Sequence, residues 1–389
     1  MVTLGIEQLL AAPLPLLKDK RLGLLCNQAA TDCSFRHSRD LLMAAFPGQL
    51  TCLFSPQHGF FAEKQDNMVE SDHGRDPLSD LPVFSLYGET RQPTAAMMDQ
   101  IDVVLVDMVD VGTRVYTFMY TMAYMLEAAA AAGKAVVVLD RPNPIGGEMI
   151  EGNILEEGFR SFVGRYPLPM RHGLTLAELA LLFNSHFQIG AELHVVKMNG
   201  WRRAMFFPDC KLPWLFPSPN MPTYGTALVY PGQVIWEGTN ISEGRGTALP
   251  FELFGAPFLD QQDILKRLAD TPLPGVFLRP LEFEPTFHKW QNQVCRGFQL
   301  HVTDPLSYRP YRTTLALLQA VFSLYPDSFA YAQPPYEYEY DILPVDLILG
   351  SRRLRQALEE GEEIMALEAS WQQELMEFNE MRRAYFLYE

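Results

Sequence analysis

The sequence predicts an α/β fold built on a parallel sheet for the first half of the chain, and a smaller α+β domain after it. Three observations predict this. Short apolar runs alternate with helical segments as far as Met198, most of these runs end in clusters of polar, glycine and proline residues, and the alternation then stops. Strands that alternate with helices form βαβ units with right-handed crossovers. At 389 residues the chain also exceeds what one core usually supports, so we expect two domains.

The predicted strands of the first half are residues 21–26, 49–54, 82–86, 101–107, 134–139 and 193–198. The fourth, IDVVLVD, is a run of Val, Leu and Ile closed by a carboxylate, which is typical of a strand buried on both faces of a parallel sheet. We expect helices at residues 38–46, 93–100, 112–132 and 175–187, the last one starting with a Thr-x-x-Glu capping box at Thr175 and Glu178. Residues 151–172 are expected to be rich in loops.

The second half lacks this regular alternation. Residues 201–222 carry five prolines and several aromatic side chains, and we interpret them as an ordered connection that lines a cleft. Beyond them, helices are predicted at residues 261–269 and 311–325 and through most of the tail from Pro344, with strands at residues 276–283 and 297–302. This mixture predicts an α+β domain.

The charge and composition of the chain exclude some classes of binding partner. A formal net charge of -16 argues against nucleic acid or an anionic membrane as a partner. No apolar run approaches the roughly 18 residues that a membrane-spanning helix needs. The five cysteines form no Cys-x-x-Cys pair and predict reduced thiols, and the N-terminal stretch lacks the basic region of an export signal. We therefore expect a cytoplasmic location; the oligomeric state stays open.

Polar side chains at the strand ends are the first place to look for chemistry. Ligands of open α/β sheets bind outside the carboxyl ends of the strands. Five predicted strands end in such clusters, at residues 27–31, 55–59, 87–91, 107–116 and 140–144, and their loops should converge on one crevice. Residues 229–257, rich in glycine and polar side chains, are expected to form the opposite wall.

Several kinds of site have no signature in the sequence. No Gly-x-Gly-x-x-Gly follows the first strand and no P-loop is present, so a nucleotide cofactor has no support. The histidines form neither His-Glu-x-x-His nor His-x-His, and no Gly-x-Ser-x-Gly occurs, so we predict neither a metal site nor a serine nucleophile.

Paired carboxylates are better represented than these other groups. Asp107 and Asp110 lie on the first wall, and Glu237 and Glu243 lie on the second. Glycoside cleavage uses two carboxyl groups that flank the scissile bond, one protonated and one ionised. The alternative is structural: Asp107 caps a helix or pairs with Arg114, and Glu243 pairs with Arg245.

The motifs SPQHGF, LPVFSLYGETRQPT, VDMVDVGTRVYTFMYTM, LDRPNP, PMRHGLTLAELA, PSPNMPT and YPGQVIWEGTNISEGRGTALPFELFGAP together resemble the exo-β-N-acetylmuramidase family over nearly the whole chain. The resemblance implies a Rossmann-like N-terminal domain, here residues 1–225, and a smaller C-terminal domain, residues 226–389, with the active site between them. It also implies release of terminal N-acetylmuramic acid from peptidoglycan fragments without a nucleotide cofactor.

One position departs from the family pattern. Family members commonly read Pro-Glu-His-Gly where this chain has Gln57 before His58, and that glutamate is the family's leading candidate catalyst. An amide cannot donate or accept a proton as a carboxyl group does. Either Glu63 or another carboxylate takes over this role, or the chain is a sugar-binding or regulatory protein without hydrolytic activity. A nucleotide-dependent Rossmann enzyme is a third hypothesis.

For a glycosidase acting on N-acetylmuramic acid or a related amino sugar, the predicted catalytic residues are Asp107, Asp110, Glu243 and His58. The predicted substrate-binding residues are Gln57, Glu63, Arg114, Tyr116, Asn143, His172, Asn220, Asn240 and Arg245. Tyrosines suit stacking on sugar rings, and an arginine suits a carboxylate such as the lactyl group. We expect a small sugar or muropeptide as the partner, with no metal and no cofactor.

Overall fold

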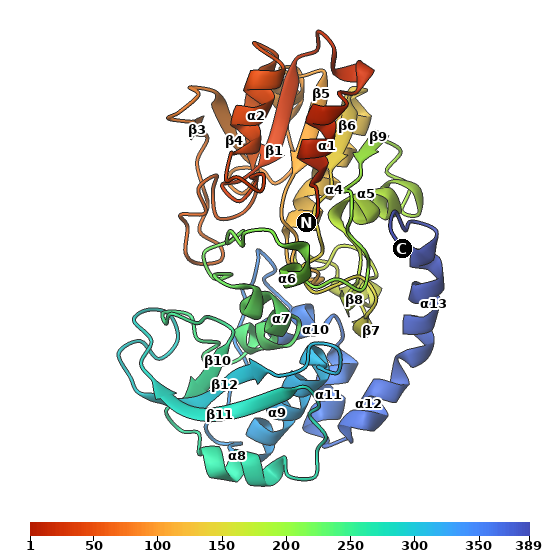
Figure 1. Cartoon of the computed structure of the whole chain (residues 1–389). Helices are drawn as coiled ribbons and strands as arrows, with labels where there is room; N and C mark the ends of the chain where they lie inside the picture. The colour runs from red at the N-terminus through yellow and green to blue at the C-terminus, as the bar shows by residue number, and fades with distance from the viewer.

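The computed structural model describes residues 1–389, with the first half at the top of Figure 1 and the second half below it. A seven-stranded sheet in the order β3-β4-β2-β1-β5-β6-β9 forms the first half. Its strands are β1 (Leu22–Cys26), β2 (Leu50–Ser55), β3 (Gly74–Arg75), β4 (Pro82–Ser85), β5 (Val103–Asp107), β6 (Ala135–Leu139) and β9 (Glu192–Val196). Every pair is parallel except β3 with β4. All residues of β1, β5 and β6 are buried, which confirms the predicted parallel sheet.

The helices of the first half are α1 (Gly5–Ala11), α2 (Ser38–Ala45), α3 (Ala95–Met98), α4 (Phe118–Ala132) and α5 (Leu176–Ser185), with the 3-10 turns η1 (Pro15–Leu17) and η2 (Glu157–Phe159). The predicted capping box of α5 is confirmed, because Thr175 accepts from the Glu178 amide and Glu178 accepts from the Thr175 amide. Helix α4 begins later than predicted. Gly112 adopts a φ of 80°, and the Arg114 amide donates to the Met170 carbonyl, so this stretch cannot be helical.

A small antiparallel hairpin of β7 (Glu151–Ile154) and β8 (Pro169–Arg171) lies in the stretch expected to be loops. Both strands are very short, and their register shifts between Glu151 and Ile154. Gly152 has a φ of 93°. Such an irregular pair lacks the period-two pattern by which strands are predicted from sequence.

The second half contains a three-stranded antiparallel sheet in the order β10-β12-β11, which confirms the predicted α+β character. Its strands are β10 (Leu253–Ala256), β11 (Val276–Phe283) and β12 (Cys295–Val302). The helices are α6 (Phe207–Cys210), α7 (Tyr224–Gln233), α8 (Gln261–Arg267), α9 (Pro310–Leu324), α10 (Pro344–Leu349), α11 (Arg352–Glu359), α12 (Ile364–Ser370) and α13 (Gln372–Arg383), with a 3-10 turn η3 (Val234–Gly238). No helix combines the length and apolar character that crossing a membrane would require.

One hydrophobic core joins the two halves. The same cluster of buried side chains includes Met119 of α4, Trp236 of η3 and Leu317 of α9. Burial of apolar surface contributes roughly 25 cal/mol per Å², so a shared core favours a fixed arrangement of the two halves. A cleft between them can therefore hold side chains from both halves in register.

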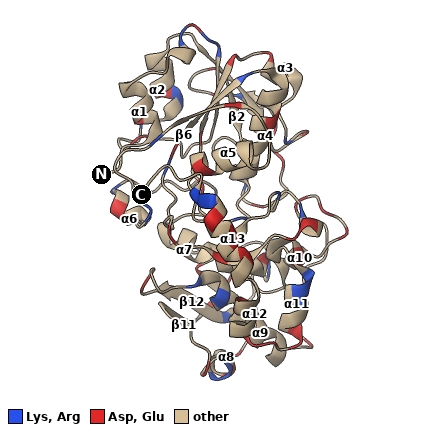
Figure 2. Cartoon of the chain, turned by 90° about the vertical axis from the view of Figure 1, so that its right-hand side faces the viewer, with Lys and Arg blue, Asp and Glu red and all other residues tan.

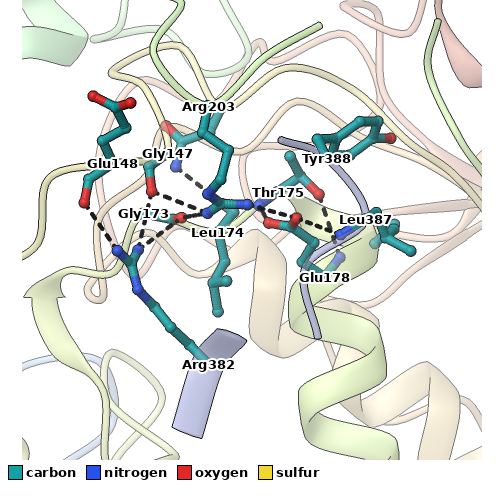
Figure 3. Close-up of polar contacts among 12 residues, drawn as sticks. Gly147, Glu148, Gly173, Leu174, Thr175, Glu178, Arg203, Arg382, Leu387 and Tyr388 are labelled. Carbon is teal, nitrogen blue, oxygen red and sulfur yellow. Dashed lines mark hydrogen bonds and ion pairs between the residues drawn. The ribbon is translucent and has the colours of Figure 1, made fainter. Parts of the chain in front are cut away.

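The C-terminal helix provides a second connection between the halves. Helix α13 carries acidic and basic side chains and leads the chain back toward α5 and β9 (Figures 1 and 2). There the Arg382 guanidinium donates to the backbone carbonyls of Gly147, Glu148, His172 and Gly173 (Figure 3). Close by, Arg203 pairs with Glu178 at 2.7 Å, and the Tyr388 hydroxyl donates to Asp140 at 2.6 Å. We call these residues the tail cluster.

Candidate active site

A cavity opens where the carboxyl ends of the N-terminal strands meet the second half of the chain. The first half lines it with Gln57 and His58 after β2 and with residues 115–118 after β5. The connection and the second half add Ser218, Asn220, Met221, Tyr230, Glu237, Arg245, Phe251, Tyr336 and Glu337. The cavity thus lies at the sheet edge where ligands of such folds bind. The sequence analysis predicted that residues 201–222 line a cleft, and three of them line this cavity.

The carboxyl group of Glu337 lies in an unusual environment on the wall of this cavity. It accepts a hydrogen bond from the Gln57 amide at 2.8 Å and one from the Tyr87 hydroxyl at 2.6 Å. Burial raises the pKa of Glu337 to about 6, and the nearby Glu237 adds to the rise. Glu337 and Tyr338 have φ values of 46° and 68°, a left-handed conformation that costs free energy in residues other than glycine and often marks functional sites. A carboxyl group that titrates near neutral pH suits proton donation.

The second carboxylate of the cavity, Glu237, has a different environment. It accepts from the Arg245 guanidinium at 2.6 Å, from the Tyr336 hydroxyl at 2.6 Å and from the Asn67 amide at 3.1 Å. Three donors, one of them a guanidinium, therefore hold Glu237, whereas Glu337 has only neutral donors. Such a difference between two carboxyl groups is the usual basis for distinct acid and base roles.

Gln57 orients Glu337. The Thr117 hydroxyl donates to the Gln57 amide oxygen at 2.7 Å, and the amide nitrogen donates to Glu337. The side chain is 4% exposed, so no solvent competes for these bonds. Gln57 therefore holds the carboxyl group of Glu337 by a hydrogen bond and does not transfer a proton itself.

His58 is a neutral part of the wall. Its Nδ1 lies 2.7 Å from the Lys64 carbonyl, and burial lowers its pKa to about 4. The imidazole is therefore uncharged at pH 7, and its Nδ1 is directed at a backbone carbonyl. This arrangement favours a role in shaping the cavity over a role as a charged acid.

A further carboxylate, Glu243, lies behind the wall and has three basic neighbours. Lys289 lies at 2.8 Å, Arg245 at 3.2 Å and His288 at 3.4 Å from it. Burial alone would raise the pKa of Glu243, but these three groups outweigh burial and lower it. Glu243 therefore anchors Arg245, which in turn holds Glu237.

Two family models match most of the chain. Residues 22–225 match the N-terminal model of the exo-β-N-acetylmuramidase NamZ, and residues 228–388 match the C-terminal model. The chain belongs to the NamZ family.

Individual relatives agree with this family assignment. The peptidoglycan β-N-acetylmuramidase NamZ of Bacillus subtilis (strain 168) is 43% identical over 387 residues, which cover 100% of this chain and 91% of the relative. Two crystal structures of DUF1343 family proteins from Bacteroides fragilis NCTC 9343 superpose with TM-scores of 0.88 and 0.79 at 33% and 26% identity. Each match covers 100% of this chain and 99% of the other chain. The predicted fold class is confirmed.

The structure brings five of the residues that we predicted for a NamZ-type site to the wall of the cavity: Gln57, His58, Tyr116, Asn220 and Arg245. Two others, Asp110 and His172, lie close together, with Asp110 Oδ2 at 3.4 Å from His172 Nε2. Both are buried, and Asp110 influences the pKa of Tyr116 electrostatically, so this pair lies behind the wall.

Asp107 and Arg114 have structural partners outside the cavity. Asp107 accepts from the Ser38 hydroxyl and pairs with Arg141, not with Arg114. The Arg114 guanidinium is fully buried and donates to the backbone carbonyls of Asn153, Leu168, Ile348 and Leu349. Its donors are committed to joining the two halves, so we assign neither residue a part in the chemistry below.

Three more predicted residues serve local structure. Glu63 is exposed and accepts from the Phe61 amide at 3.2 Å. The Asn143 side chain bonds the Leu174 carbonyl and the Ile145 amide, and Asn240 bonds the Ser328 carbonyl and the Ala330 amide. The structure therefore offers no support for Glu63 as the carboxylate that replaces the missing family glutamate.

Sequence reasoning missed Glu337 altogether and named Glu237 only as a possible partner. Glu337 stands in the run PPYEYEYD, where alternating tyrosine and glutamate resemble an exposed strand. The available signal was a carboxylate between aromatic side chains directly after two prolines. That pattern alone does not distinguish a buried acid from a surface one.

Proposed function

We propose that this chain is an exo-acting glycoside hydrolase that releases terminal N-acetylmuramic acid from peptidoglycan fragments. We place the reaction in the cleft between a proposed N-terminal domain, residues 1–225, and a proposed C-terminal domain, residues 226–389. One observation carries the proposal: two buried carboxyl groups, Glu237 and Glu337, line the same cavity in different environments. The family membership supplies the substrate class, and the B. subtilis relative bears the name of a peptidoglycan β-N-acetylmuramidase.

The two carboxyl groups have separate roles in this proposal. Glu337 donates a proton to the oxygen of the leaving group, because its raised pKa keeps it protonated closer to neutral pH than an ordinary glutamate. Glu237, held by Arg245, is the carboxylate on the other side of the scissile bond. Gln57 positions Glu337 and so compensates in part for the absence of a carboxyl group at residue 57.

The test is hydrolysis of chromogenic nitrophenyl β-glycosides of N-acetylmuramic acid and of a muropeptide panel by the purified chain. We expect turnover by the wild type, and a fall in kcat of about 10²- to 10⁴-fold in both Glu337→Gln and Glu237→Gln. The control is Glu339→Gln, since the Glu339 side chain accepts from the backbone amides of Tyr340 and Asp341 and does not line the cavity. Binding of these sugars without turnover would instead establish a sugar-binding protein.

We also infer a cytoplasmic role in recycling cell-wall fragments. All five cysteines are free thiols, and four of them are buried, as is usual in a reducing compartment. Cell fractionation followed by immunodetection tests this inference, and protein found chiefly outside the cytoplasm would contradict it.

A further inference from the structure

Arg91, in the loop after β4, is a basic side chain without an acidic partner. No carboxylate lies within the 4.0 Å of an ion pair, and the Nε and Nη2 atoms are buried without any hydrogen-bond partner. Arg91 as a whole is half-buried, but most covered polar atoms in folded proteins are paired, and these two are not. A guanidinium in this state needs an explanation in terms of what it binds.

Aromatic rings hold the Arg91 guanidinium in place. Its central carbon lies 3.7 Å from the centroid of the Tyr338 ring, 4.8 Å from that of Tyr87 and 5.5 Å from that of Phe162. Cation–π contacts of this kind stabilise a cation, and Nη1 is the guanidinium nitrogen that is not covered. The guanidinium is therefore positioned before any anion binds.

Arg91 lies beside the proposed acid. Tyr87, which contacts Arg91, donates its hydroxyl to Glu337, and Tyr338 follows Glu337 in the chain. Phe162, the third ring, directly precedes Val163 in the cavity wall. The charge of Arg91 acts on Glu337 and lowers the pKa of this group against the larger effect of burial. Arg91 and Glu337 nevertheless form no ion pair.

The basic side chains in the carboxylate network of the cavity are already occupied. Arg245 pairs with Glu237 at 2.6 Å, and Lys289 pairs with Glu243 at 2.8 Å. A negatively charged ligand would have to compete with these carboxylates. Arg91 has no such competitor.

We propose that Arg91 binds a carboxylate of the sugar substrate and thereby selects N-acetylmuramic acid over N-acetylglucosamine. The two sugars differ by the lactyl ether, whose carboxylate matches the planar donors of a guanidinium. This inference rests on the proposed function, because it concerns the substrate of the same cavity. It also assigns a consequence to binding: once a carboxylate neutralises Arg91, the proton on Glu337 is held more tightly.

The experiment compares Arg91→Met and Arg91→Lys with the wild type on nitrophenyl glycosides of N-acetylmuramic acid, its methyl ester and N-acetylglucosamine. We expect Arg91→Met to reduce kcat/KM for the acid about 10- to 100-fold, mainly through KM, and to abolish the preference of the wild type for the acid over its ester. Arg91→Lys should restore part of this preference. Arg202→Met, at an exposed arginine, is the matched control.

A second measurement tests the electrostatic effect of Arg91 on the proposed acid. Because Arg91 lowers the pKa of Glu337, Arg91→Met should move the alkaline limb of the pH profile of kcat/KM upward, which a merely structural role would not do. An unchanged preference for the acid over the ester in Arg91→Met, with hydrolysis intact, would overturn the role of Arg91 and leave the proposed function standing. If no glycoside is hydrolysed, the proposed function fails. Calorimetry then still tests the role of Arg91, by comparing the binding of N-acetylmuramic acid and of its ester to the wild type and to Arg91→Met.

Discussion

Two buried polar clusters join the halves of this molecule, and an arginine in each differs in how completely its N–H groups are hydrogen-bonded. In the tail cluster, the Arg382 guanidinium donates to four backbone carbonyls and to Asn379. In the cavity, the carboxyl group of Glu337 has only neutral donors and a raised pKa, and Arg91 lacks any acidic partner. The Arg382 guanidinium is satisfied within the fold, whereas the Arg91 guanidinium leaves donors for a ligand to complete.

This difference indicates which residues contribute to stability and which contribute to catalysis. A buried charge with a full set of hydrogen bonds holds two segments together, and removing it leaves its partners unpaired. A buried acid or base with an incomplete set costs stability and is retained where it acts on a ligand. We therefore expect substitutions in the tail cluster to change stability, and substitutions in the cavity to change activity.

The largest expected effect on stability is that of Arg382→Met. The substitution leaves carbonyls at residues 147–148 and 172–173 without this donor, and we expect a loss of roughly 3 kcal/mol in the free energy of unfolding. Denaturant unfolding measures this loss, and kcat of the folded fraction at 25 °C should stay within about twofold of the wild type.

The neighbouring Arg383→Met is the matched control. The Arg383 side chain is 58% exposed and forms a surface ion pair with Glu380 at 3.0 Å. Exposed pairs contribute little, so we expect a change of less than about 0.5 kcal/mol. Equal losses of unfolding free energy in Arg382→Met and Arg383→Met would show that the buried hydrogen bonds of Arg382 contribute no more to stability than a surface ion pair.

A smaller effect concerns the dependence of stability on pH through Asp140. Burial raises the pKa of Asp140 to about 7, against its hydrogen bonds from Tyr388, Ala177 and Thr175. Between about pH 4 and 7 the folded state then binds more protons at this group than the unfolded state, so its contribution to stability falls as pH rises.

We therefore expect the free energy of unfolding of the wild type, relative to that of Asp140→Asn, to fall as pH rises through this range. The fall should be on the order of 1 kcal/mol per pH unit. Urea unfolding of both proteins at several pH values measures it. The exposed Asp270→Asn serves as the control. A difference independent of pH would show that Asp140 keeps an ordinary pKa in the folded state.

The fold could be predicted from the sequence because each central strand is a continuous apolar run. Local pattern also gave the cap of α5 at Thr175 and Glu178. The hairpin of β7 and β8 was missed, since its pairing depends on contacts across 14 intervening residues, 155–168, and not on a local period.

The cavity was predictable only where its wall follows directly from a strand end. Gln57 and His58 come immediately after β2, so topology alone places them at the ligand-binding edge. Glu337 is 280 residues away from Gln57 in the chain, and only tertiary packing brings their side chains together. Asp107 is the last residue of β5, but Arg141 in the loop after β6 pairs with it, and no local pattern reveals that partner.

The smallest expected effect concerns the residue at which this chain departs from the family pattern. Gln57→Glu would place a second carboxyl group against Glu337, where the amide now donates at 2.8 Å. Two adjacent carboxyl groups cannot both ionise readily, so the pair shares a proton and the higher of its apparent pKa values rises.

In the wild type, kcat/KM should fall as pH rises through about 6, because Glu337 loses the proton that it donates. In Gln57→Glu this alkaline limb should move upward by about one pH unit or more. Gln100→Glu, at an exposed glutamine, should leave the limb in place. If the alkaline limb of Gln57→Glu also stays near its wild-type position, the group that titrates in catalysis is not Glu337. The contrast between the satisfied Arg382 of the tail cluster and a reactive cavity would then rest on Glu237 and Arg91 alone.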